Sequence, residues 1–189
     1  MGMLEIRWHG RGGQGAKTAS TLLAAVAIEE GKYGQGFPEY GPERGGAPMK
    51  GFTRISDEPI RYHCGIYHPG IVVVLDPTLL PLVDVTEGLK EDGSLLINTP
   101  LSPNEVRKRY GLNVEKLYTI DATKISLEEI GKPIPNTPML GALIKAMGGM
   151  ISLETVLGDI RKKFARKFPE KIIQGNLNAV KRAYEEVKI

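Results

Sequence analysis

Short apolar runs rich in β-branched residues recur along the chain and restrict the folds open to it. The longest reads Ile-Val-Val-Val-Leu within residues 70–76, and similar runs occupy residues 94–98 and 116–121. Because these runs lack alternating polar positions, both faces of each strand must be buried, as in a parallel sheet. Helical spacing of apolar side chains marks residues 16–30, and Ser102 opens another helix as its N-cap. Strands that alternate with helices predict a three-layer α/β/α, Rossmann-like sheet.

The sheet is expected to be mostly parallel with one antiparallel pair. Residues 50–56 alternate as a half-exposed strand does, and residues 60–64 can pair with them as a hairpin through an Asp-Glu-Pro turn. A capping box predicts that a helix starts at Ser126, and the pattern beyond Pro138 is entirely helical. With one core of ordinary size, residues 1–189 are expected to form a single domain.

A glycine-rich loop lies between the predicted strand at residues 4–8 and the helix at residues 16–30. Gly10, Gly12 and Gly15 fit the spacing G-x-G-x-x-G, which places free backbone N–H groups and a helix dipole where they favour an anion. An arginine within the loop adds a planar fork suited to phosphate. The residues predicted to bind a cofactor are therefore Gly10, Arg11, Gly12, Gly13, Gln14 and Gly15.

Three interpretations of this loop compete. A triphosphate-binding loop needs G-x-x-x-x-G-K-[ST], but Ala16 shifts Lys17 and Thr18 out of frame. An NAD site needs an acid roughly 20 positions further on, at the end of a second strand. Residues 31–36 show neither that acid nor a strand pattern, which weakens this interpretation without removing it. The third interpretation is that the glycines only permit tight packing of strand on helix.

Residues 31–50 do not resemble an ordinary connection. Nine of these twenty residues are Gly or Pro, so regular structure is not expected. Aromatic and charged residues nevertheless occur among them, and aromatic and Arg side chains on a semi-rigid loop are typical of interfaces. We expect an ordered functional surface that carries Tyr33, Phe37, Glu39, Tyr40, Glu43 and Arg44.

Composition excludes several classes of function. The net charge of +3 is too small to indicate nucleic-acid binding, and no apolar run has the length of a membrane span. With Cys64 as its one cysteine, the chain cannot form an internal disulfide or a site with several thiolate ligands. His9 is expected to be a hydrogen-bonded structural histidine, and Cys64 a half-buried strand residue. A cytoplasmic location without membrane contact is the expectation.

Three motifs occur in order along the chain. They are Trp-His-Gly-Arg-Gly-Gly-Gln-Gly at residues 8–15, Phe-Pro-Glu-Tyr-Gly-Pro-Glu-Arg-Gly-Gly-Ala-Pro at 37–48, and Asn-Thr-Pro-Met-Leu-Gly-Ala at 136–142. Together they resemble the gamma subunit, or gamma domain, of 2-oxoacid:ferredoxin oxidoreductases, most of all pyruvate:ferredoxin oxidoreductase. The resemblance runs over essentially the whole chain. One departure is Gly45, where relatives often carry Arg or Thr.

The resemblance implies a subunit that is not catalytic alone, in an enzyme that decarboxylates a 2-oxoacid, with pyruvate the expected substrate. Thiamine diphosphate, coenzyme A and iron–sulfur clusters would serve the whole complex, held mainly by alpha, beta and delta subunits or their fused equivalents. Electrons would pass to ferredoxin and the acyl group to coenzyme A. The alternative function is a free-standing Rossmann-type nucleotide-binding protein.

At residue level, the resemblance implies a subunit interface near the thiamine site. Its expected members are Phe37, Glu39, Tyr40, Glu43, Arg44, Asn136 and Thr137. The glycine loop would approach a phosphate of coenzyme A or thiamine diphosphate. No catalytic residue and no metal ligand is expected within the chain.

Overall fold

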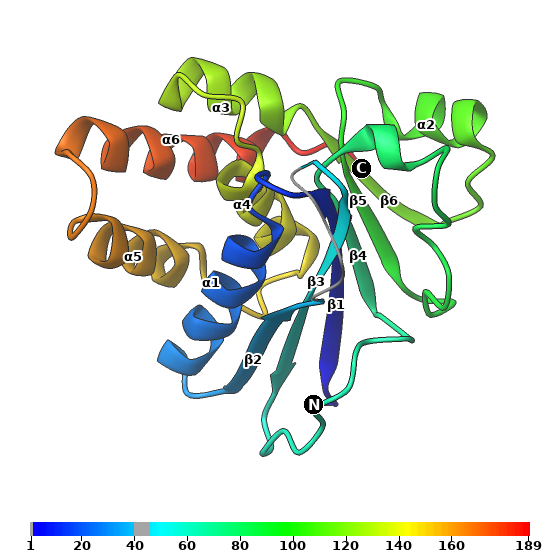
Figure 1. Cartoon of the computed structure of the whole chain (residues 1–189), viewed down its shortest axis with the longest axis horizontal. Coiled ribbons are helices and arrows are strands. Elements are labelled where there is room, and N and C mark those ends of the chain that lie inside the picture. The colour runs from blue at the N-terminus through cyan, green and yellow to red at the C-terminus, as the bar shows by residue number, and fades with distance from the viewer. Residues whose placement is uncertain (1, 40–45) are drawn as a thin grey trace.

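A computed structural model of the chain describes residues 2–39 and 46–189. Its centre is a sheet of six strands in the order β2-β3-β1-β4-β5-β6 (Figure 1). Five strands run in the same direction, and β3 alone is antiparallel, pairing with β1 on one side and β2 on the other. The strand bounds are β1 Leu4–Arg11, β2 Tyr33–Pro38, β3 Pro48–Ser56, β4 Ile71–Val74, β5 Ser94–Asn98 and β6 Lys116–Ile120.

Helices cover both faces of the sheet, but unequally. One face carries α1 Ala16–Glu29, α3 Ala122–Ile130, α4 Asn136–Ala146, α5 Leu153–Phe164 and α6 Glu170–Glu186; the other carries α2 Pro103–Tyr110 and the short helix η1 Pro77–Leu79 (Figure 1). Alternate residues of the central strands enter the two cores, so Val73 packs with the larger helical layer and Val72 with Val106 of α2. This arrangement confirms the predicted three-layer α/β/α fold.

Helix α4 lies between the sheet and α6. Nine consecutive residues, Asn136 to Ile144, are buried, because α4 contacts β5 and β6 on one side and α6 on the other. The close approach to α6 requires Gly141, since a Cβ there would collide with the carbonyl oxygen of Val180. The apolar Met-Leu-Gly-Ala sequence of this helix therefore matches its central position.

The expectation that residues 31–50 lack regular structure is wrong over Tyr33–Pro38, which form the edge strand β2. The glycines that favour a loop have a packing role here. A Cβ at Gly34 would collide with the carbonyl of Ala24, and one at Gly36 with that of Ser20. The strand can therefore lie directly against α1 only because these two positions have no side chain.

The predicted hairpin between residues 50–56 and 60–64 is also wrong. Strand β3 pairs instead with β1 and β2, and residues 60–64 form no strand. Arg54 explains the path of this segment, because its guanidinium donates to the carbonyl oxygens of Cys64 and Gly65 at 2.9 and 3.1 Å. Cys64 is consequently exposed and lies outside any strand, contrary to expectation.

Of the two helix starts predicted from capping boxes, one is confirmed and the other is wrong. The capping box of Ser102 and Glu105 is confirmed at the start of α2. Ser126, however, is an interior residue of α3, which begins at Ala122 with Asp121 as its N-cap. The Ser126 hydroxyl instead donates to the carbonyl oxygens of Lys132 and Ile134, fixing the connection to α4. Among the helices of the described residues, none is long and apolar enough to cross a membrane.

Candidate functional site

The glycine loop lies where the predicted fold places it, between the carboxyl end of β1 and the start of α1. Gly13 and Gly15 adopt positive φ angles of 96° and 84°, a region that L side chains rarely enter. The Gly12 N–H donates to the Ala47 carbonyl at 3.1 Å, which ties the loop to the start of β3. The first N–H groups of an α-helix have no intrahelical acceptor, and at the start of α1 the N-cap Gly15 has no side chain that could accept from them.

The loop occupies the position at which α/β sheets usually bind ligands. Strand β1 has β3 on one side and β4 on the other, so the chain order reverses at β1. Ligands bind outside the carboxyl ends of the strands at such a switch point. The loop therefore combines the expected location with a helix start that has no side-chain cap.

Asp76 holds this loop in shape. Its Oδ2 accepts from Arg11 Nε at 3.1 Å and Gln14 Nε2 at 2.6 Å, and its Oδ1 accepts from the Thr78 N–H and hydroxyl at 2.9 and 2.7 Å. Burial of the carboxylate opposes its ionisation. The hydrogen bonds from Thr78 and Gln14 and the charge of Arg11 outweigh burial, so the pKa of Asp76 lies below its ordinary value. Asp76 thus stays ionised and balances the charge of Arg11.

Arg11 and Gln14 are largely engaged within the chain. The Arg11 guanidinium also donates to the Thr78 hydroxyl at 3.0 Å and the Gly46 carbonyl at 3.2 Å. Gln14 accepts from the Arg11 N–H at 2.8 Å through its side-chain oxygen. The structure therefore places the Arg11 fork on Asp76 and Thr78, and leaves the exposed Gly13 and the start of α1 as the open part of the loop.

Asn136 and Thr137 meet the loop from a distant part of the chain. They are the first residues of α4, and both are buried. A Cβ on Gly15 would lie 2.5 Å from the Asn136 side-chain nitrogen, so Gly15 allows α1 and α4 to begin side by side. The Thr137 hydroxyl donates to Asn136 Oδ1 at 3.4 Å. Two of the three sequence motifs are thereby brought together.

Phe37 and Glu39 mark the other end of the predicted interface. Phe37 packs on Phe52 with ring centroids 5.2 Å apart, and the Arg54 guanidinium lies 5.7 Å from its ring. Glu39 is exposed and lies 3.9 Å from Lys50 Nζ. Tyr40, Glu43 and Arg44 lie outside the described residues.

His9 is structural, as expected. Its side chain is 3% exposed and its Nε2 accepts from Arg7 Nε at 3.1 Å. Arg7 in turn donates to the carbonyl oxygens of Val85 and Glu87. Burial, followed by the charges of Arg7 and Lys50, lowers the pKa of His9 to about 3, so the imidazole is neutral. Residues two apart on a strand share a face, so the spacing places Arg7 and His9 on the same face of β1. The hydrogen bond between them does not follow from the spacing.

Within residues 2–39 and 46–189, no three His, Cys, Asp or Glu side chains are grouped so that they could hold a metal ion. The single cysteine of the chain does not fit an iron–sulfur cluster, whereas the uncapped start of α1 fits a phosphate.

The sheet order and the loop define a Rossmann-like α/β chain, and comparison with known proteins specifies the family. Residues 5–186 match the family model described as pyruvate ferredoxin/flavodoxin oxidoreductase. Pyruvate synthase subunit PorC of Thermotoga maritima is 54% identical over 184 residues, covering 97% of this chain and 94% of that one. The pyruvate/ketoisovalerate oxidoreductases common subunit gamma of Pyrococcus abyssi is 50% identical, covering 99% and 98%.

Solved structures agree with these relatives. The crystal structure of the Thermotoga maritima pyruvate oxidoreductase subunit PORC has a TM-score of 0.87 at 51% identity and covers 100% of this chain and 98% of that one. A 2-oxoglutarate:ferredoxin oxidoreductase from Magnetococcus marinus shares the fold, with a TM-score of 0.77 at 20% identity, over 98% of this chain and 31% of that chain. The chain belongs to the pyruvate ferredoxin/flavodoxin oxidoreductase family. Within it, the chain is of the gamma-subunit type, a subunit of a 2-oxoacid:ferredoxin oxidoreductase.

Proposed function

We propose that the chain is the gamma subunit of an enzyme that oxidatively decarboxylates pyruvate with coenzyme A, giving acetyl-CoA, CO₂ and reduced ferredoxin. The observation that carries this proposal is full-length identity of 54% to a chain named as a pyruvate synthase subunit. Relatives of about the same identity carry the name pyruvate/ketoisovalerate oxidoreductases common subunit, so branched 2-oxoacids are the competing substrates. Family membership disfavours a free-standing nucleotide-binding protein.

The proposal assigns most of the chemistry to partners. Alpha, beta and delta subunits, or fused equivalents, would hold thiamine diphosphate and the iron–sulfur clusters and pass electrons to ferredoxin. The lone exposed cysteine supports this division, because one thiolate does not ligate a cluster. Neither nucleic acid nor a membrane is part of the proposal, and the location proposed is the cytoplasm.

The chain's own contribution is proposed to be a surface for a phosphate-bearing cofactor, either coenzyme A or thiamine diphosphate. Gly12, Gly13 and Gln14 would line that space. Support comes from the start of α1, which has no side-chain cap, from the open space around Gly13, and from the Asn136 amide beside Gly15. An anion placed at a helix N-terminus is stabilised by about 0.3–1 kcal/mol. Gly10, Arg11 and Gly15 shape the loop and are included as supporting residues.

Reconstitution tests the assignment as a subunit. The purified chain is expected to show no pyruvate-dependent reduction of ferredoxin, and to restore it when mixed with the alpha, beta and delta chains. Turnover by the isolated chain, or full turnover of the other chains without it, would contradict the proposal. Comparing pyruvate with 2-oxoisovalerate and 2-oxoglutarate in the same assay identifies the substrate.

The cofactor surface is tested separately with Gln14→Ala in the assembled enzyme. This substitution removes two hydrogen bonds that hold the loop on Asp76 and on the Arg11 N–H, without adding bulk or charge. We expect the KM for coenzyme A, or the Kd for thiamine diphosphate, to rise about tenfold, the effect of losing about 1.4 kcal/mol. Gln174→Ala on exposed α6 is the matched control. If neither the KM for coenzyme A nor the Kd for thiamine diphosphate changes, the glycines of the loop only permit close packing of β1 on α1.

A further inference from the structure

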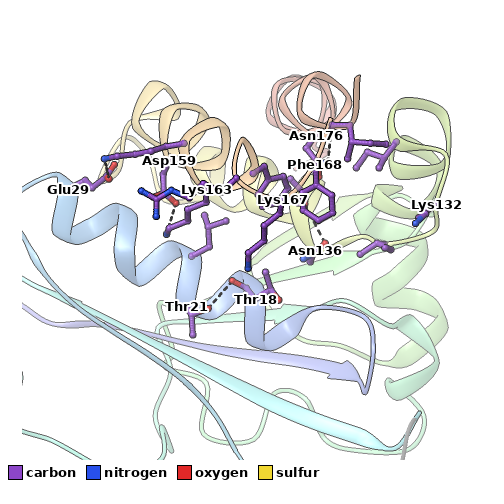
Figure 2. A pocket seen from close by; sticks show the side chains of 18 residues that line it. Thr18, Thr21, Glu29, Lys132, Asn136, Asp159, Lys163, Lys167, Phe168 and Asn176 are labelled. Carbon is purple, nitrogen blue, oxygen red and sulfur yellow. Dashed lines mark hydrogen bonds and ion pairs between the residues drawn. The ribbon is translucent and has the colours of Figure 1, made fainter. Parts of the chain in front are cut away.

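A groove of about 860 Å³ lies among the helices on one face of the sheet, and one end of it reaches the start of α1, where Thr18 and Asn136 line it beside the glycine loop (Figure 2). It runs between α1, α5 and α6 and the connection from α3 to α4. The apolar side chains along it are Leu22, Ile130, Ile134, Phe164, Phe168 and Ile172. Phe168 and Ile134 are 45% and 37% exposed, which is unusual for large apolar side chains.

Cations surround this apolar floor. Two of them form ion pairs within the chain: Lys162 Nζ lies 2.9 Å from Glu29, and Lys163 Nζ lies 2.8 Å from the buried Asp159. The contact between Lys163 and Asp159 does not have the geometry of a hydrogen bond. The other three, Lys132, Arg166 and Lys167, have no carboxylate partner among the residues that the structure describes.

The unpaired cations stand on opposite sides of the floor. Lys132 follows the carboxyl end of α3, whereas Arg166 and Lys167 follow the carboxyl end of α5. The three cations therefore do not all serve to balance the dipole of a single helix. In Figure 2, Phe168 lies between Lys132 and Lys167. The groove therefore presents an apolar strip flanked by positive charge.

Two of the uncharged polar groups within the groove have partners inside the chain, and the other three, Thr18, Asn136 and Thr137, line the end of the groove beside the glycine loop. The Thr21 hydroxyl donates to the Lys17 carbonyl, and the Asn176 amide donates to the Ile172 carbonyl. A pocket for a small polar molecule normally offers several convergent, free polar groups. An apolar strip with a charged rim is instead the surface into which an amphipathic helix packs.

We propose that this groove docks an acidic amphipathic helix from another subunit of the assembled enzyme. The inference rests on the proposed function, since it requires those subunits to be present. The helix would place its apolar side chains on Phe168 and Ile134, and these contacts would supply most of the binding affinity. Its Asp or Glu side chains would lie near the unpaired cations and would fix the orientation of the helix in the groove.

Cysteine protection tests the docking. Cys64→Ser leaves a chain without thiols, to which Phe168→Cys adds a reporter in the groove; Lys108→Cys, on exposed α2 across the sheet, is the control. Assembly is expected to slow maleimide labelling of the groove thiol about tenfold or more, as burial of an interface core predicts. The control thiol should change less than twofold. Ile134→Cys repeats the test should Phe168→Cys fail to fold.

A photo-crosslinker on the same thiol identifies the occupant. The expected product joins the groove to an Asp- and Glu-rich peptide of another subunit. A crosslink to a basic peptide or to a second copy of this chain would overturn the proposal, and so would equal labelling before and after assembly. A small molecule that protects the thiol in the isolated chain, found by native mass spectrometry, would also overturn it. Failure to assemble at all contradicts the proposed function instead.

Charge reversal provides an independent measurement. Arg166→Glu with Lys167→Glu is expected to raise the Kd for the partner subunits about tenfold at low salt, and less at high salt because the charges are screened. Lys108→Glu with Lys181→Glu changes the net charge equally on exposed positions outside the groove. Equal effects of the two double variants would show that only net charge matters, which would remove the proposed rim.

Discussion

Asp76 holds the glycine loop in place through its side-chain hydrogen bonds. It accepts hydrogen bonds from two loop side chains and from both donors of Thr78, across a separation of 65 residues from Arg11. The end of the buried run at residues 70–76 was predictable, but this partnership was not. A pairing across such a distance depends on β1 and β4 being neighbours, which local patterns do not specify.

Asp76→Asn tests the value of that carboxylate. We expect the variant to lose about 1–3 kcal/mol of unfolding free energy at pH 7, the usual worth of hydrogen bonds to a charged group. Because the folded pKa is lowered, the contribution is complete above the unfolded pKa of about 3.9 and disappears as pH falls through the lower folded value. Urea unfolding at pH 7 and pH 3 should show the two proteins converging in acid; a constant difference would contradict this.

His9 gives a pH dependence over a different range. The folded imidazole has a pKa of about 3, whereas the unfolded one titrates near 6.5. Below about pH 6 the unfolded state therefore binds the extra proton, and stability falls by up to about 1.4 kcal/mol per pH unit until the folded group titrates. His9→Gln keeps an acceptor for Arg7 and should remove this slope in unfolding measured from pH 7.5 to 4.5. The exposed control His63→Gln should keep it.

At the scale of elements, close packing decides what could be predicted from the sequence. Strands β4 and β5 are buried along their whole length and β6 over most of its length, so the pattern and the structure agree. The strand β2 was missed because Gly34 and Gly36 are loop-forming residues by local propensity, yet here they let a backbone touch α1. The sequence shows which residues are small, but it does not show which backbone atoms pack against them in the fold.

Gly141 and Gly158 form a matched pair for this point. Both are helical, but a Cβ at Gly141 would strike the Val180 carbonyl, whereas one at Gly158 meets nothing within 4 Å. Gly141→Ala should destabilise the chain by about 1–3 kcal/mol through overpacking of α4 on α6. Gly158→Ala should stabilise it by about 0.5–1 kcal/mol, since Gly is unfavourable in a helix. Thermal melts of the two variants shifting in the same direction would refute the packing role.

The three sequence motifs of the molecule gather at one edge of the sheet. The loop at Gly12–Gly15 and the start of α4 are adjacent, and Gly46, which follows the undescribed part of the middle motif, accepts a hydrogen bond from Arg11. The proposed interface residues Phe37 and Glu39 lie at the end of β2. Their grouping was predictable only from the family resemblance, because the motifs are far apart in sequence.

The middle motif is expected to act in assembly. Tyr40→Ala with Arg44→Ala should lower recovery of the complex or its turnover, because aromatic and Arg side chains dominate interface energetics. Thermal melting of the isolated chain should not change. Tyr62→Ala, at an exposed aromatic outside the motif, is the control. If the double variant assembles and turns over normally, Tyr40 and Arg44 have no role in assembly, and the motif at residues 37–48 only connects neighbouring elements.

The central position of α4 has a consequence for biosynthesis. Its inner side packs on β5 and β6, but its outer side is covered by α6, which is translated after all the elements it packs against. Until residues 170–186 have left the ribosome, the apolar outer side of α4 lacks α6 as a packing partner. The nascent chain can form its sheet early, yet it completes this core only once α6 has been synthesised. Truncation within α6 should accordingly produce aggregation-prone chains, because the exposed surface belongs to the middle of the core.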